Sequence, residues 1–182
     1  MAGLPFFTQV LACQKAAGTA FNTYTIAKTV INQTELVSLP ANFFDVGTRL
    51  RITVKGAISN VVTSQPTFTF QVMLGAVAVY SSGAITTNTT ANTNIPFTLV
   101  IDLRCDTIGT GTTAKFLGIG KFDCTAMASG STSLTVPTTA PAVGTGFDST
   151  AAQTLDFFVG ISASNASNGI TIWDYCVEQL WS

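Results

Sequence analysis

Every second residue from Phe97 to Cys105 is apolar, and the residues that alternate with them up to Asp106 are polar except for Val100. Successive side chains of a β-strand point to opposite faces of its sheet, whereas a helix repeats its apolar positions every three to four residues. We therefore predict a strand here with one buried face. The same alternation marks Arg49–Ser59, where Gly56 is expected to form a bulge or bend near the end of the strand.

Turn residues and prolines divide most of the remaining chain into further short strand-like segments, and no stretch shows an amphipathic helical period. These segments are Tyr24–Asn32, Glu35–Leu39, Thr67–Leu74, Ala76–Ser81, Ala114–Cys124, Thr132–Val136, Thr154–Ser162 and Ile170–Leu180. The long connections Ser82–Asn94 and Pro137–Gln153 favour a path that crosses between sheets over a plain meander. We predict an all-β fold: a single antiparallel β-sandwich, jelly-roll-like, with Phe43 and Phe44 plugging one end of its core.

The beginning of the chain is apolar but lacks strand alternation. We therefore predict an extended N-terminal arm over residues 1–22, followed by the β-sandwich domain over residues 23–182. Five apolar side chains of the arm are expected to pack into a groove of a partner: Leu4, Phe6, Phe7, Val10 and Leu11. A secretory signal is disfavoured because no Lys or Arg precedes Lys15.

Charged side chains are scarce: 9% of the residues are Asp, Glu, Lys or Arg, and the net charge is −1. The chain lacks the basic patch of a nucleic-acid-binding protein, and its apolar runs are too short to span a membrane. With 47% hydrophobic residues it carries more apolar side chains than one sandwich buries, so we expect a homo-oligomer. The one basic cluster, Arg49, Arg51 and Lys55, is interpreted as a solvated strand face.

Side chains suited to catalysis are equally scarce, because the chain contains no histidine. This excludes a Ser-His-Asp triad and His-based metal sites. A pair of carboxylates of the kind that glycosidases use remains open, but Asp102 and Asp106 share an outward strand face and Asp148 lies in a turn. We expect no enzymatic activity, no catalytic or metal-binding residues and no cofactor.

Four cysteines, Cys13, Cys105, Cys124 and Cys176, show no CxxC spacing. A simple hairpin around Gly109–Gly111 would place Cys105 opposite a residue near Phe116, so that Cys105 and Cys124 would not be neighbours. We interpret all four as buried free thiols, which indicates synthesis in a cytosol.

Large aromatic side chains recur at odd positions near the end of the chain, at Trp173, Tyr175 and Trp181. On one regular strand they would share a face. Core or subunit packing is the favoured interpretation, since aromatic residues dominate cores and interfaces. The alternative is a platform for a sugar, beside a mobile Asn-rich loop that contains Asn88, Asn92 and Asn94.

Two further stretches of the sequence are distinctive. The first is Leu39-Pro40-Ala41-Asn42-Phe43-Phe44-Asp45-Val46-Gly47-Thr48-Arg49-Leu50-Arg51-Ile52, continuing through Gly56-Ala57-Ile58-Ser59-Asn60. The second is Pro141-Ala142-Val143-Gly144-Thr145-Gly146-Phe147-Asp148-Ser149-Thr150-Ala151-Ala152. Both stretches resemble small β-sandwich virion proteins of tailed bacteriophages. The resemblance implies a jelly-roll or related sandwich that often trimerises and serves as a capsid decoration protein, a head fibre or a tail component.

From this resemblance we expect a capsid decoration (cement) protein, made in the host cytoplasm, that binds the major capsid protein on the outside of a phage shell. Its contacts would involve the arm and a low-charge face of the sandwich, and Trp173, Tyr175 and Trp181 are further candidates for contact with a partner. The alternative is a receptor- or glycan-binding module of a head fibre or tail.

Overall fold

The computed structural model describes residues 8–23, 26–140 and 142–180, which form two antiparallel β-sheets packed face to face. The strands are β1 (Thr8–Cys13), β2 (Phe21–Asn22), β3 (Lys28–Thr29), β4 (Val37–Leu39), β5 (Arg49–Asn60), β6 (Thr67–Leu74), β7 (Val77–Ser81), β8 (Ile85–Thr86), β9 (Asn92–Thr107), β10 (Lys115–Cys124), β11 (Ser133–Val136), β12 (Ala142–Val143), β13 (Gln153–Ile161) and β14 (Gly169–Leu180). A 3-10 helix, η1, covers Gln33–Glu35. Within the described residues, no helix is long and apolar enough to cross a membrane.

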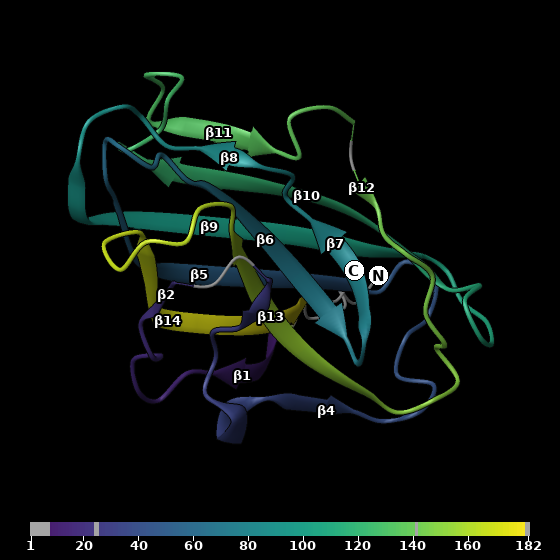
Figure 1. Ribbon diagram of the computed structural model, residues 1–182. Helices are drawn as coiled ribbons and strands as arrows, with labels where there is room; N and C mark the ends of the chain where they lie inside the picture. Colours follow the sequence, from purple (N-terminus) through teal and green to yellow (C-terminus); the bar gives the residue numbers. More distant parts are fainter. Residues whose placement is uncertain (1–7, 24–25, 141, 181–182) are drawn as a thin grey trace, which may run out of the picture.

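One sheet has eight strands, in the order β1-β14-β5-β9-β10-β11, with β2 beside β14 and β12 beside β10. The other has six, in the order β3-β13-β6-β7, with β4 beside β13 and β8 beside β6. In Figure 1, β6, β7 and β13 cross in front of the long strands of the eight-stranded sheet. The predicted all-β sandwich is confirmed.

The chain crosses between the two sheets several times. Strand β5 lies between β14 and β9, which are distant from each other in sequence, and β6 and β7 belong to the opposite sheet. The connection Pro137–Gln153 also crosses between sheets, as predicted, because β11 and β12 lie in the eight-stranded sheet and β13 in the six-stranded one.

The alternation in the sequence corresponds to the two faces of the strands. In β9 the five alternate residues from Phe97 to Cys105 are buried, and in β5 Leu50, Ile52 and Val54 are buried. The hairpin of β9 and β10 pairs Cys105 with Phe116, as predicted. Long strands with one apolar face therefore form where the period-2 pattern is strongest.

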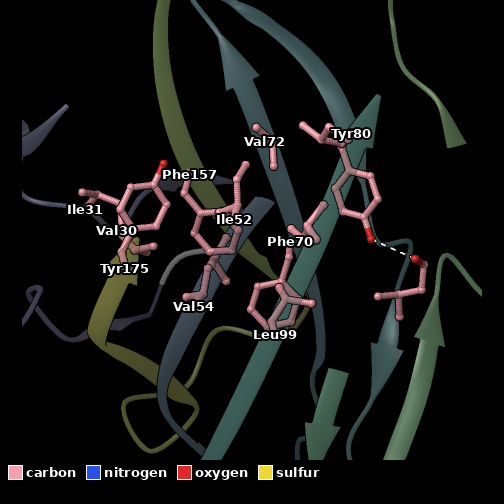
Figure 2. Packing of buried hydrophobic residues seen from close by; sticks show 14 of the residues in the cluster. Val30, Ile31, Ile52, Val54, Phe70, Val72, Tyr80, Leu99, Phe157 and Tyr175 are labelled. Atoms are coloured by element: carbon pink, nitrogen blue, oxygen red, sulfur yellow. Dashed lines mark hydrogen bonds between the residues drawn. The ribbon is translucent and has the colours of Figure 1, made fainter. Parts of the chain in front are cut away.

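Aromatic rings join the two sheets in the middle of the core. Phe70 of β6 is fully buried, with its ring centroid 6.0 Å from that of Phe157 in the same sheet. Across the sandwich it lies 5.7 Å from Phe97 and 5.4 Å from Phe122. Figure 2 shows Phe70 and Phe157 between two buried tyrosines, of which Tyr80 donates a hydrogen bond to the carbonyl oxygen of Val136 at 3.0 Å.

A second aromatic cluster closes one end of the core. Phe44 makes edge contacts with Phe116 at 5.1 Å and with Phe147 at 5.4 Å between ring centroids. Phe44 is buried, whereas Phe43 is only partly buried and packs against it. The predicted aromatic plug is confirmed, with Phe44 as its inner member.

Two of the predicted strands and one predicted loop are shorter in the structure than expected. The carboxamide of Asn32 accepts from the N–H of Thr34 and begins η1, so β4 starts only at Val37. Of the predicted strand over residues 24–32, only Lys28–Thr29 is assigned, and residues 24 and 25 lie outside the described residues. The predicted connection Ser82–Asn94 contains β8, and β9 already begins at Asn92, whose Nδ2 donates to Asn60 Oδ1 at 2.7 Å.

The arm prediction is wrong for residues 8–22, because they belong to the sandwich. Strand β1 pairs with β14 along its length, and the N–H groups of Gln14 and Gly18 donate to carbonyl oxygens of β14 at 2.7 and 2.8 Å. Without this cover, β14 would present an open edge of unpaired backbone groups. Residues 1–7, including Leu4, Phe6 and Phe7, lie outside the described residues.

The interpretation of four free thiols is wrong for two of them. Pairing of β1 with β14 places Cys13 opposite Cys176, with 4.1 Å between their Cα atoms, and the two form a disulfide. Cys105 and Cys124 are free and buried, as predicted. The cysteines therefore no longer support synthesis in a reducing compartment.

Candidate interaction surfaces

The outward side chains of the eight-stranded sheet form rows across neighbouring strands. One row, in register, consists of Leu180, Arg49, Arg104 and Leu117, and the next of Glu178, Arg51, Asp102 and Ile119. Six of the eight basic residues of the chain lie on this sheet: three on β5, one on β9 and two on β10. The sparse charge of the chain is thus concentrated on one sheet.

Ion pairs across neighbouring strands connect several of these charged side chains. Arg51 Nε lies 2.8 Å from Asp102 Oδ1 across β5 and β9, and Lys55 Nζ lies 2.9 Å from Asp174 Oδ2 across β5 and β14. Both pairs are largely exposed, so each contributes only about 0–1 kcal/mol to stability. Arg49 has no ion pair within the described residues.

A shallow depression, here called the arginine hollow, lies over these rows. It is lined by Arg49, Arg51, Asp102, Arg104, Leu117, Ile119 and Leu180. Ile119 is 45% exposed, a high fraction for an isoleucine. Arginine beside exposed aliphatic side chains is characteristic of protein interfaces. Arg49 and Arg51 lie two positions apart, so the sequence predicted that they share a face of β5. The residues beside them are determined by the pairing of β5 with β14 and β9.

A β-bulge separates the two aromatic residues that were expected on one face of β14. Ile172 pairs with Gly56 and Asp174 with Lys55, so Trp173 has no partner on β5. The extra residue reverses the alternation, so Tyr175 is buried in the core while Trp173 is 50% exposed on the outer face. The predicted single-faced row is wrong for this pair, and Trp181 lies outside the described residues.

Gly56 permits the bulge on the neighbouring strand. A Cβ atom at this position would overlap the carbonyl oxygen of Thr171 and would lie 3.1 Å from Cα of Ile172. Gly56 was expected to mark a bulge or bend in its own strand, but β5 continues to Asn60 and the bulge lies in β14. The absence of a side chain lets the bulged backbone approach β5 closely.

Near Trp173 lies a second depression, here called the amide hollow. Its polar lining consists of Asn22, Ser59, Thr93, Asn94, Ser167 and Thr171. The N–H of Asn94 donates to Ser59 Oγ at 2.9 Å, and Asn22 Nδ2 donates to the carbonyl oxygen of Ala166 at 3.2 Å. Asn88 and Asn92, expected in a mobile loop, instead hydrogen-bond to each other at 2.7 Å.

The residues predicted to bind a partner do not lie together on one surface of the structure. Val10 is exposed on β1 beside Glu178, whereas Leu11 packs against the core. Val10 and Trp173 are therefore the predicted residues that remain available on the described surface. Sequence reasoning missed the outward aliphatic residues Leu117 and Ile119, since alternation identifies a strand but not which outward residues gather.

Burial changes the acidity of the two free thiols. It raises the pKa of Cys105 to about 11, with a smaller contribution from the nearby carboxylates of Asp106 and Asp45. Burial also raises the pKa of Cys124. Both side chains are therefore protonated at neutral pH and lack the thiolate that a cysteine nucleophile requires.

Asp156 of β13 is a buried carboxylate within this mostly uncharged sandwich, 8% exposed. Thr29 Oγ1 donates to its Oδ1 at 2.7 Å, and the N–H of Phe157 donates to the same oxygen at 2.6 Å. Burial raises the pKa of Asp156 despite these hydrogen bonds. The folded state therefore holds the proton of this group more tightly than the unfolded chain does.

Because its pKa is raised in the folded state, Asp156 should make the protein less stable as the pH rises. Between the unfolded pKa of about 3.9 and the higher folded pKa, the native state binds more protons, so this group lowers the free energy of unfolding as pH rises. Asp156→Asn keeps an acceptor oxygen and cannot ionise. Its stability relative to the wild type should increase with pH in this window, by at most about 1.4 kcal/mol per pH unit. Urea unfolding of both proteins at several pH values between 4 and 7 measures this difference, and a difference independent of pH would contradict it.

No protein-family model matches the chain, and no curated protein matches it. Among solved structures, it is similar to the CBM2 module of the evolved Dit of Lactobacillus casei BL23 phage J-1. The identity is 8% over 97% of this chain and 98% of that chain, with a TM-score of 0.39.

Proposed function

We propose that this chain is a non-enzymatic structural protein of a tailed-phage particle that decorates the outside of the shell as a homotrimer. The observation that carries the proposal is the arginine hollow, an exposed patch of arginine and aliphatic side chains. In the proposal this charged patch replaces the low-charge face that the sequence led us to expect. The resemblance of residues 39–60 and 141–152 to small virion sandwiches supports the same function. The partner would be the major capsid protein.

The arginine hollow suits a protein surface that presents aliphatic and acidic side chains. Leu117, Ile119 and Leu180 would bury apolar area on contact, and Arg49, which lacks an ion pair within the described residues, could pair with a carboxylate. In the proposal, residues 1–7 add contacts through Leu4, Phe6 and Phe7. Repeated weak contacts on a symmetric shell would give avidity without tight individual binding.

Two properties follow from this proposal. In purified particles, the copy number should be comparable with that of the major capsid protein, measured by quantitative mass spectrometry. In addition, Ile119→Asp should weaken binding to shells that lack this protein by at least about tenfold, because it places a carboxylate in the apolar part of the hollow.

The matched control is Val62→Asp, which introduces the same charge at a residue that is 57% exposed and lies outside the arginine hollow. This variant should bind shells as the wild type does. A copy number of only a few per particle, or equal binding by both variants, would contradict the proposal.

A further inference from the structure

The exposed ring of Trp173 is the first observation that points to a second binding site. A tryptophan side chain normally contributes its large apolar area to a core or an interface, yet this one is 50% exposed. The bulge of β14 and the missing side chain of Gly56 hold it on the outer face. A specific backbone irregularity thus presents a flat aromatic surface to solvent.

The amide hollow is the second observation. It begins on the same strand, since Thr171 lines it and precedes Trp173 by two residues, about 7 Å along an extended chain. Ile170 and Ile172 are buried on the other face, so Thr171 and Trp173 both lie on the outer side. The ring and the hollow therefore form neighbouring parts of one surface.

The polar groups of the hollow are uncharged and held in place. None of the described residues that line it is acidic or basic. Two of its carboxamides have hydrogen-bond partners: Asn94 Oδ1 accepts from Ser59 Oγ at 3.5 Å, and Asn22 Nδ2 donates to the carbonyl oxygen of Ala166. The nearest charged neighbours on these strands, Lys55 and Asp174, neutralise each other in an ion pair.

We infer that Trp173 and the amide hollow together bind a neutral saccharide. A sugar ring presents an apolar face of C–H groups, which can stack on an aromatic ring, and hydroxyl groups, which exchange hydrogen bonds with carboxamides and hydroxyls. Recognition of an anion or of nucleic acid would call for basic side chains, which the described lining lacks. This inference does not depend on the proposed function, because the arginine hollow is lined by different residues.

The fluorescence of Trp173 provides a direct test. The chain contains two tryptophans, so Trp181→Phe leaves Trp173 as the single reporter. This variant is titrated with neutral oligosaccharides of glucose, of galactose and of N-acetylglucosamine. We expect a saturable change in emission with at least one of the three, and calorimetry with the unaltered chain should give the same affinity. Calorimetry also replaces fluorescence if Trp181→Phe does not fold.

Variants then locate the site. Trp173→Ala should weaken binding of the active oligosaccharide by at least tenfold, and Asn94→Ala should weaken it several-fold. The control is Val46→Ala, which shortens a side chain that is 64% exposed and precedes β5, at the end of this strand remote from Ser59. It should bind as the unaltered chain does.

Three results would overturn the inference: no saturable binding of any of the three oligosaccharides, full affinity in folded Trp173→Ala, or binding restricted to acidic saccharides. These results leave the shell-binding proposal intact, because Ile119→Asp tests that proposal separately.

Discussion

Replacement of Phe70 by alanine should lower the free energy of unfolding by about 3–5 kcal/mol. The ring is fully buried and lies within 6.0 Å, between centroids, of Phe97, Phe122 and Phe157. Because these neighbours come from both sheets, a cavity here removes contacts across the sandwich and not only within one strand pair. Chemical denaturation measured by circular dichroism gives the loss directly.

Phe158→Ala is the matched control. Phe158 lies next to Phe157 on β13, but it faces outward and is only partly buried. The same truncation there should cost about 1 kcal/mol. Equal losses in the two variants would mean that the two-sheet core described here is wrong.

Removal of the disulfide by the double substitution Cys13→Ser and Cys176→Ser should lower stability by about 2–5 kcal/mol. The bond connects residues separated by 163 positions, so it restricts the unfolded chain over nearly its whole length. It also fixes β1 on β14. Thermal unfolding of the oxidised protein and of the double variant measures the effect.

Reduction provides the control for this second prediction. A reductant should lower the melting temperature of the wild type and leave that of the double variant unchanged. In denaturant without reductant, two of the four cysteines should react with a thiol reagent, since Cys105 and Cys124 are free. Reaction of all four would contradict the disulfide.

Several elements of the sandwich could be predicted because they depend on local pattern alone. Strands β5, β6, β10, β13 and β14 lie close to their predicted bounds, and Cys105 faces Phe116 as the turn length implied. In each case a period of two, bounded by glycine or proline, determines which face is buried. The short strands β2, β3, β8 and β12 carry little pattern and form because longer strands offer them an edge.

The surfaces were less predictable, because they depend on which strands become neighbours. Trp173 and Tyr175 have the spacing of one face, yet a bulge opposite Gly56 separates them. Arg49 and Arg51 share a face as the sequence implied, but Ile119 and Leu117 join them only through β9 and β10.

By itself, the sequence determined that this protein is an antiparallel all-β sandwich with few charged side chains and a phenylalanine-rich core. The alternation of apolar residues and the composition can both be read from the chain without knowing which strands become neighbours. Only the tertiary structure decided that residues 8–22 belong to the sandwich, that Cys13 meets Cys176, and that Trp173 faces solvent beside the amide hollow. Each of these depends on the register between strands far apart in sequence. That register is set by the packing of the whole core and is not encoded in any single segment.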